Sequence, residues 1–88
     1  MTVIDTHCHL ADAKFRDDVE AVIARASDAG VAQLISVGAI GPIENDRLTV
    51  EIAERHENIF AAVGVHPYDA NDCTPDRIAQ LRALATSK

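Results

Sequence analysis

The sequence predicts an α/β protein in which parallel strands alternate with helices. Three apolar runs rich in valine, isoleucine and alanine are each followed by a segment whose apolar residues recur at helical spacing. Hydrophobic residues make up 48% of the 88 residues and aromatic residues only 3%, so aliphatic side chains must form the core, as is typical where strands face helices. The short connections between these segments favour parallel strands with the helices packed outside.

The first strand is predicted at Val3 to His9, as a short buried strand. A loop follows, in which Leu10 and Phe15 are expected to fold back over the strand end. A helix then begins near Asp17, because acidic residues in a first turn interact favourably with the helix dipole. Gly30 is predicted to end this helix as its C′ residue.

The second unit consists of a largely apolar strand at Val31 to Val37 and a helix at Glu44 to His56. Glu51 and Arg55 are spaced for an ion pair on the surface of this helix. His56 lies in the last turn, where a solvated histidine interacts favourably with the helix C-terminus and needs no functional role.

The third unit begins with a strand at Ile59 to Val65, which His66 and the following proline terminate. A helix starts at Thr74 as N-cap, with Pro75 in the first helical position. Its predicted apolar stripe is Ile78, Leu81 and Leu84 or Ala85.

The resulting order βαβαβα predicts an incomplete domain. A parallel sheet buried on both faces normally needs more than three strands. The arrangement looks like the opening of a TIM (β/α)8 barrel, which takes about 250 residues and carries its active site at the carboxyl ends of the strands. We therefore expect residues 1–88 to be a single incomplete domain, the first three βα units of such a barrel, with no second domain.

Charge and cysteine content restrict the partners and the compartment. The formal net charge of -6 gives no field that attracts a polyanion, so a nucleic-acid partner would require bound cations. Cys8 and Cys73 do not suggest a disulfide framework, and there is no secretory segment or long apolar run. We expect a reducing cytoplasmic location and no membrane partner.

Two histidines at the end of the first strand are the main candidates for a functional site. Strict alternation would place Asp5, His7 and His9 on one face and Cys8 on the other, where it would be a small buried residue. Two imidazoles on one face can bind one Zn-like cation, and Asp5 could orient an imidazole from outside the ligand shell. The spacing alone favours a metal role but does not exclude polar residues that are merely hydrogen-bonded or solvated at a strand end.

Two motifs give the sequence a specific resemblance. The segment I-D-T-H-C-H-L at Ile4 to Leu10, followed by V-G-V-H-P-Y-D-A at Val63 to Ala70, resembles the start of the TatD family of metal-dependent hydrolases and deoxyribonucleases. The resemblance covers essentially the whole chain but only about a third of a barrel. It implies a (β/α)8 barrel with a divalent, usually two-metal, site that hydrolyses phosphodiester bonds, typically trimming DNA.

Carried over by position, the resemblance implies roles for four residues. His7 and His9 match metal ligands, and the ion would be Zn²⁺, Mg²⁺ or Mn²⁺. His66 matches a histidine assigned to substrate or outer-shell contact, and Asp5 matches the aspartate that precedes the ligands. Tyr68 stands where the family often has a further histidine, which weakens a phosphate contact there.

The chain lacks counterparts of the glutamate, histidines and aspartate that the family supplies from later strands. Two imidazoles fall short of the three protein ligands normal in a catalytic zinc site, and the general base is missing, so the catalytic residue is unknown. We expect weak metal binding by the isolated chain, and self-association or pairing with a complementary barrel piece.

Two alternatives remain open at the level of the sequence. The first is an enzyme of the wider amidohydrolase class, which also begins with His-x-His on its first strand and hydrolyses amide, ester or cyclic-amide bonds. The second is a catalytically inactive truncated fragment, which could persist as a helper or a metal-handling module. Ligand spacings on later strands would separate the first alternative from a TatD-type hydrolase.

Overall fold

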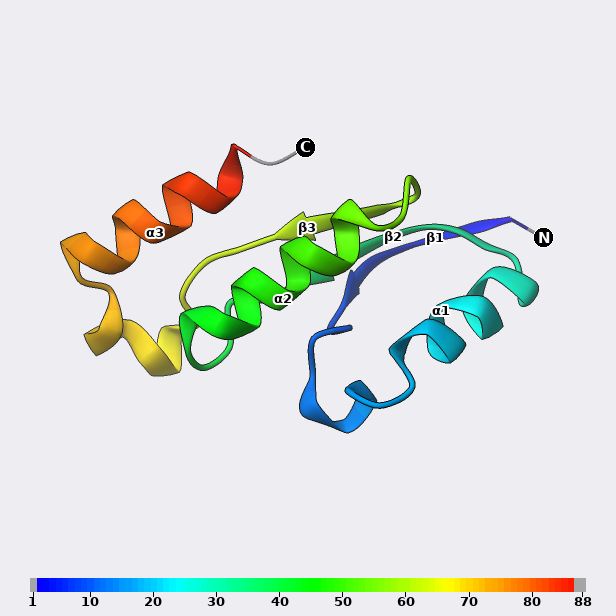
Figure 1. Cartoon of the computed structure of the whole chain (residues 1–88), viewed down its shortest axis with the longest axis horizontal. Coiled ribbons are helices and arrows are strands. Elements are labelled where there is room, and N and C mark those ends of the chain that lie inside the picture. The colour runs from blue at the N-terminus through cyan, green and yellow to red at the C-terminus, as the bar shows by residue number, and fades with distance from the viewer. Residues whose placement is uncertain (1, 87–88) are drawn as a thin grey trace.

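Three parallel strands form one sheet in the order β1-β2-β3. The computed structural model describes residues 2–86, and Figure 1 shows strands and helices alternating along the chain. The strands are β1 (Val3–Cys8), β2 (Val31–Val37) and β3 (Ile59–Ala62), and the helices are α1 (Val19–Asp28), α2 (Ile43–Glu54) and α3 (Pro75–Ala85). Two short 3-10 helices, η1 (Ala13–Phe15) and η2 (Pro67–Asp72), follow β1 and β3. The predicted βαβαβα order is confirmed.

The predicted helix ends are confirmed where local chemistry determines them. Gly30 follows α1 with a φ of 101°, a left-handed conformation that glycine adopts without a steric penalty. The hydroxyl of Thr74 accepts a hydrogen bond from the Arg77 N–H at 3.1 Å, and Pro75 opens α3. The sequence positions of these two residues therefore set the boundaries of their helices.

The third strand is shorter than predicted, because it ends at Ala62 rather than Val65. Pairing with β2 ends where the N–H of Gly38 donates to the carbonyl of Ala62 at 2.9 Å. Beyond that point the N–H of Gly64 donates to the side chain of Asp46 at 3.3 Å instead of to a neighbouring strand. A side chain from α2 thus replaces the strand ladder, which strand periodicity could not predict.

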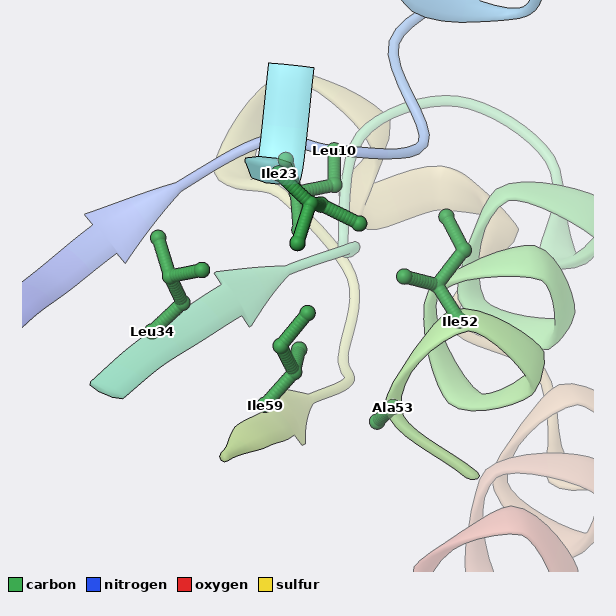
Figure 2. Close-up of a cluster of buried hydrophobic side chains, with 6 residues drawn as sticks. All are labelled: Leu10, Ile23, Leu34, Ile52, Ala53 and Ile59. Carbon is green, nitrogen blue, oxygen red and sulfur yellow. The ribbon is translucent and has the colours of Figure 1, made fainter. Parts of the chain in front are cut away.

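The core lies between the sheet and the first two helices. Figure 2 shows its buried side chains converging from β2, β3, α1, α2 and the segment after β1. The residues are Leu10, Ile23, Leu34, Ile52, Ala53 and Ile59. Since α1 and α2 both contribute to this single cluster, they cover the same face of the sheet, as a barrel wall requires. The expected return of Leu10 over the strand end is confirmed, whereas Phe15 is only half-buried.

The predicted burial of the first strand is wrong. Ile4 is 56% exposed, and Val3 is also exposed, because α1 and α2 cover one face of the sheet and leave the other face open. In addition, β1 pairs only with β2 within residues 2–86 and is an edge strand. The predicted stripe on α3 is also only partly buried, since Ile78 is exposed. The ion pair expected within α2 is wrong as well, because Arg55 pairs with Glu20 of α1 at 3.6 Å.

Candidate metal centre at the strand ends

His7 and His9 lie together at the carboxyl end of β1. Their ring centroids are 5.0 Å apart, and the rings meet edge to face with an interplanar angle of 77°. The pairing of β1 with β2 is irregular between Asp5 and Cys8, which are three residues apart but pair with residues only two apart on β2. Strict alternation therefore does not hold across this stretch, although the two imidazoles are neighbours as predicted.

The orientation of the His9 ring determines which nitrogen could bind a metal. Its Nδ1 lies 2.8 Å from the carbonyl oxygen of Val37 at the end of β2. A carbonyl can only accept, so Nδ1 carries the proton and donates, and Nε2 of the neutral ring presents its lone pair. A hydrogen bond from one ring nitrogen to a backbone carbonyl is the usual outer-shell partner of a metal-binding histidine. The donor chemistry at His9 therefore fits a divalent ion.

Asp5 makes a backbone contact rather than one with an imidazole. Its Oδ1 accepts a hydrogen bond from the N–H of His7 at 3.0 Å, so the carboxylate holds the chain at the irregular part of β1. Burial raises the pKa of the neighbouring Cys8 thiol to about 11, the Asp5 charge adds to this shift, and a hydrogen bond with Ser36 opposes it. Cys8 is therefore a neutral, half-buried thiol near pH 7.

His66 follows β3 at the same edge of the sheet, with β2 between it and β1. Its Nδ1 accepts a hydrogen bond from the backbone N–H of Tyr68 at 3.1 Å, so in the neutral ring the proton resides on Nε2. The centroids of the His66 and Tyr68 rings are 4.7 Å apart, and Tyr68 is 93% exposed. The Nε2–H of the neutral His66 ring is therefore a hydrogen-bond donor.

A small cavity of about 220 Å³ opens beside His9, between the segments that follow β1 and β2. Its lining includes Asp12, Ile40 and Asn45 as well as His9. Within residues 2–86, no group of three or more histidine, cysteine, aspartate or glutamate side chains lies close enough to hold a metal ion. Two imidazoles are fewer than the three protein ligands that a catalytic zinc site normally has.

The comparison with protein families decides the family of this chain. The family of TatD-related DNases matches residues 4–88. The chain belongs to this family. The resemblance seen in the two histidine motifs is therefore confirmed, and with it the α/β fold of the metal-dependent hydrolases.

Relatives of the TatD family share this region at moderate identity. The chain is 35% identical over 83 residues to an uncharacterized metal-dependent hydrolase, YabD, of Bacillus subtilis. This alignment covers 94% of the chain and 32% of YabD. It is 32% identical over 83 residues to the 3′-5′ ssDNA/RNA exonuclease TatD of Cronobacter sakazakii. This alignment covers 94% of the chain and 31% of that exonuclease. The chain thus spans about a third of the length of these relatives.

The crystal structure of YjjV, a TatD homologue from Escherichia coli, superposes on this chain with a TM-score of 0.77. The sequences are 33% identical, and the match covers 92% of this chain and 30% of YjjV. The predicted fold, the N-terminal part of a TatD-type TIM barrel, is confirmed by this superposition.

Two features of the site were not predicted from the sequence. The carbonyl of Val37 is a backbone group and leaves no signature in residue type, so only the positions of the strands reveal it as the partner of His9. Asp46 was also missed, because its sequence neighbours Asn45 and Arg47 are polar and give no signal of a buried carboxylate. No helix within residues 2–86 is long and apolar enough to cross a membrane.

Proposed function

We propose that this chain contributes the first part of the active site of a TatD-type hydrolase that cleaves phosphodiester bonds in DNA, as an exonuclease does. The observation that carries the proposal is the His7–His9 pair at 5.0 Å, with the Nδ1 of His9 engaged by a carbonyl and its Nε2 available to an ion. Family membership supports phosphodiester hydrolysis over the amide or ester hydrolysis of the wider amidohydrolase class.

In this proposal residues 1–88 form one incomplete domain, the first three βα units of a (β/α)8 barrel. The exposure of Ile4 at 56% and of Phe60 at 41% supports it, because strand residues that face a barrel interior lack a cover here. The remaining ligands and the general base would come from later strands of a barrel. The two free cysteines, Cys8 and Cys73, are compatible with a reducing cytoplasm, which is part of the proposal.

His7 and His9 would bind one ion of a two-metal site through their imidazole nitrogens. The ion would be Zn²⁺, Mg²⁺ or Mn²⁺. When bound, such ions polarise a phosphate oxygen and activate water for attack. The Val37 carbonyl would keep the His9 ring in the tautomer that ligation needs. A bound cation would also offset the formal charge of -6, which otherwise repels a nucleic acid.

His66 and Asp5 would act outside the metal shell. The Nε2–H of His66 would donate to a phosphate oxygen of the substrate, because its Nδ1 already accepts from Tyr68. Asp5 would keep His7 in place by holding its backbone N–H. Neither role requires direct contact with an ion.

The sharpest test transplants the chain into a complete barrel. Residues 1–88 would replace the matching N-terminal third of the Cronobacter sakazakii exonuclease, and degradation of single-stranded DNA would be measured with Mg²⁺, Mn²⁺ or Zn²⁺. We expect metal-dependent 3′-5′ degradation, a loss of at least about 100-fold in His7→Ala and His9→Ala, and a smaller loss in His66→Ala.

His56→Ala is the matched control, because His56 lies between α2 and the start of β3, beside Glu20 and away from the carboxyl ends of the strands. Its activity should equal that of the parent chimera. A folded chimera without activity would instead support the inactive-fragment alternative. Full activity in His7→Ala and His9→Ala would contradict the assigned ligands.

A further inference from the structure

One buried carboxylate joins the segments that follow β2 and β3. Asp46 on α2 is fully buried, and its Oδ1 accepts hydrogen bonds from the N–H groups of Ala39 at 2.7 Å and Gly64 at 3.3 Å. The approach is so close that a Cβ on Gly38 would overlap this oxygen. A single side-chain atom therefore fixes two backbone segments at the carboxyl edge of the sheet.

The contact with Ala39 extends to His66. Ala39 is held at a φ of 64°, a conformation that residues other than glycine rarely adopt, so it depends on its surroundings. Its N–H is bound by Asp46, and its carbonyl accepts a hydrogen bond from the N–H of His66 at 2.7 Å. The backbone position of His66 thus depends on Asp46 through one intermediate residue.

Arg77 of α3 contacts both Asp46 and the segment that follows β2. Its side chain is nine-tenths buried, and its Nη2 lies 3.8 Å from Asp46 Oδ2 and donates to the carbonyl of Gly41 at 2.9 Å. The N–H of Gly41 donates in turn to Asp69 of η2 at 3.0 Å. Since Asp69 lies three residues after His66, the loop after β2 and the segment that carries His66 are held together at several points.

Arg77 is the ion-pair partner of the buried Asp46. Neither Asp46 Oδ2 nor Arg77 Nε has a hydrogen-bond partner among residues 2–86, so the guanidinium at 3.8 Å is the compensating charge that the described structure offers. Buried ion pairs are often no more stabilising than apolar residues of the same size. A pair whose hydrogen bonds all end on the segments around His66 is better explained by positioning than by stability alone.

We propose that Asp46 and Arg77 are positioning residues that set the place of His66 at the active-site edge. This inference rests on the proposed function for the role of His66, and it adds two residues outside the metal and substrate contacts. Loss of the guanidinium would release Ala39, Gly64 and the backbone of His66, while β2 stays paired at its other end.

Backbone amide exchange at single-residue resolution, measured in residues 1–88 of the folded chimera, tests the proposal without any catalysis. The reference is the N–H of Leu34 in the middle of β2, which donates to the carbonyl of Asn58 at 3.0 Å. In the unaltered chain the His66 amide should be protected although it lies outside every helix and strand. Arg77→Met should accelerate exchange at Ala39 and His66 at least 10-fold relative to Leu34.

Arg82→Met is the matched control, because Arg82 is an exposed arginine on the same helix, and it should leave these ratios unchanged. Arg77→Lys keeps the positive charge but loses the planar set of guanidinium N–H donors. We therefore expect an acceleration of exchange at Ala39 and His66 between those of the unaltered chain and Arg77→Met. Equal acceleration at His66 and Leu34 in Arg77→Lys, or an unprotected His66 amide in the unaltered chain, would overturn the proposal even if Arg77→Met does not fold.

Activity gives a second, independent measurement. In the chimera, Arg77→Met should lower kcat at least 10-fold with little change in the metal concentration needed for half-maximal rate, because His7 and His9 lie at the end of β1, away from Arg77 on α3. An inactive chimera with the expected exchange pattern would contradict the proposed function and leave the positioning role supported. Unchanged kcat in a folded Arg77→Met chimera would overturn the positioning role.

Discussion

At the scale of single residues, His9 and His66 differ in the ring nitrogen that carries the proton. His9 donates from Nδ1 to a carbonyl, whereas His66 accepts at Nδ1 from a backbone N–H. These opposite patterns separate a ring that can bind a cation through Nε2 from a ring that can donate through Nε2. The division of roles therefore follows from two backbone contacts.

The tautomers can be measured directly. Long-range ¹H–¹⁵N correlation spectra of the chain at pH 8 should show His9 protonated at Nδ1 and His66 protonated at Nε2. Addition of Zn²⁺ should shift the Nε2 resonance of His9 more than either nitrogen of His66. A His9 ring protonated at Nε2 would contradict the ligand assignment.

Cys8 provides a prediction about pH. Burial raises the pKa of its thiol from 9.0 to about 11, so at pH 8 its thiolate fraction is about 100-fold below that of an unperturbed cysteine. Iodoacetamide should therefore modify the exposed Cys73 much faster than Cys8, as mass spectrometry of the separate peptides would show. Equal rates at the two cysteines would show that the thiol is not desolvated.

The same shift makes folding stability depend on alkaline pH. The folded state favours the protonated thiol of Cys8, so its contribution is fully present below pH 9.0 and is lost as pH rises towards about 11. Cys8→Ser should remove this part of the pH dependence. Cys73→Ser is the matched control and should retain it.

At the scale of elements, α3 depends on its N-cap more than the other helices do. Its stripe is only partly buried, so tertiary packing stabilises it less. Thr74→Ala removes the hydroxyl that accepts from the Arg77 N–H and should lower the free energy of unfolding by about 1 kcal/mol. Thr74→Ser keeps an acceptor and should cost much less. Chemical denaturation of both variants measures the difference, and equal losses would contradict the capping role.

Element positions could be predicted because short-range signals determine them. The strand at Val31 to Val37 was predicted to the residue, and Gly30 and Thr74 marked helix ends. The errors came from contacts between residues distant in sequence. Asp46 ends β3 early by binding Gly64, and Glu20 of α1 takes the Arg55 that local spacing assigned to a partner within α2.

The candidate site was predictable in part for the same reason. The His-x-His spacing placed two imidazoles side by side, because His7 lies near the end of β1 and His9 follows it by two residues. The Val37 carbonyl and the Asp46–Arg77 pair could not be predicted, since they depend on how β2, α2 and α3 lie around that strand. The assignment of Asp5 and His66 to outer roles stays a prediction.

At the scale of the whole molecule, two imidazoles are too few for tight metal binding. Within residues 2–86 no third ligand joins His7 and His9. The isolated chain should therefore bind Zn²⁺ or Mg²⁺ weakly in calorimetry and show no appreciable hydrolysis of single-stranded DNA. Metal-dependent trimming that His7→Ala abolishes would show that the isolated chain completes a site, by itself or by association.

The open sheet leads to a final prediction about association. In the described chain β1 and β3 each pair only with β2, so both outer edges present backbone N–H and C=O groups to other chains. The apolar side chains of β1 are exposed as well, including Ile4 at 56%. In a closed barrel no strand edge is free, and the sheet face that carries these apolar side chains is covered. The isolated chain should therefore be marginally stable and should self-associate or bind a complementary barrel piece.

Sedimentation velocity over a range of concentrations should show species larger than a monomer, and Ile4→Lys should shift the distribution towards the monomer because a charge on an edge strand opposes pairing. Ile78→Lys is the matched control, since Ile78 is also exposed but lies on α3. It should leave the distribution unchanged. A compact monomer at every concentration, with a cooperative thermal transition above about 60 °C, would mean that three βα units bury enough apolar surface to be stable without the rest of a barrel.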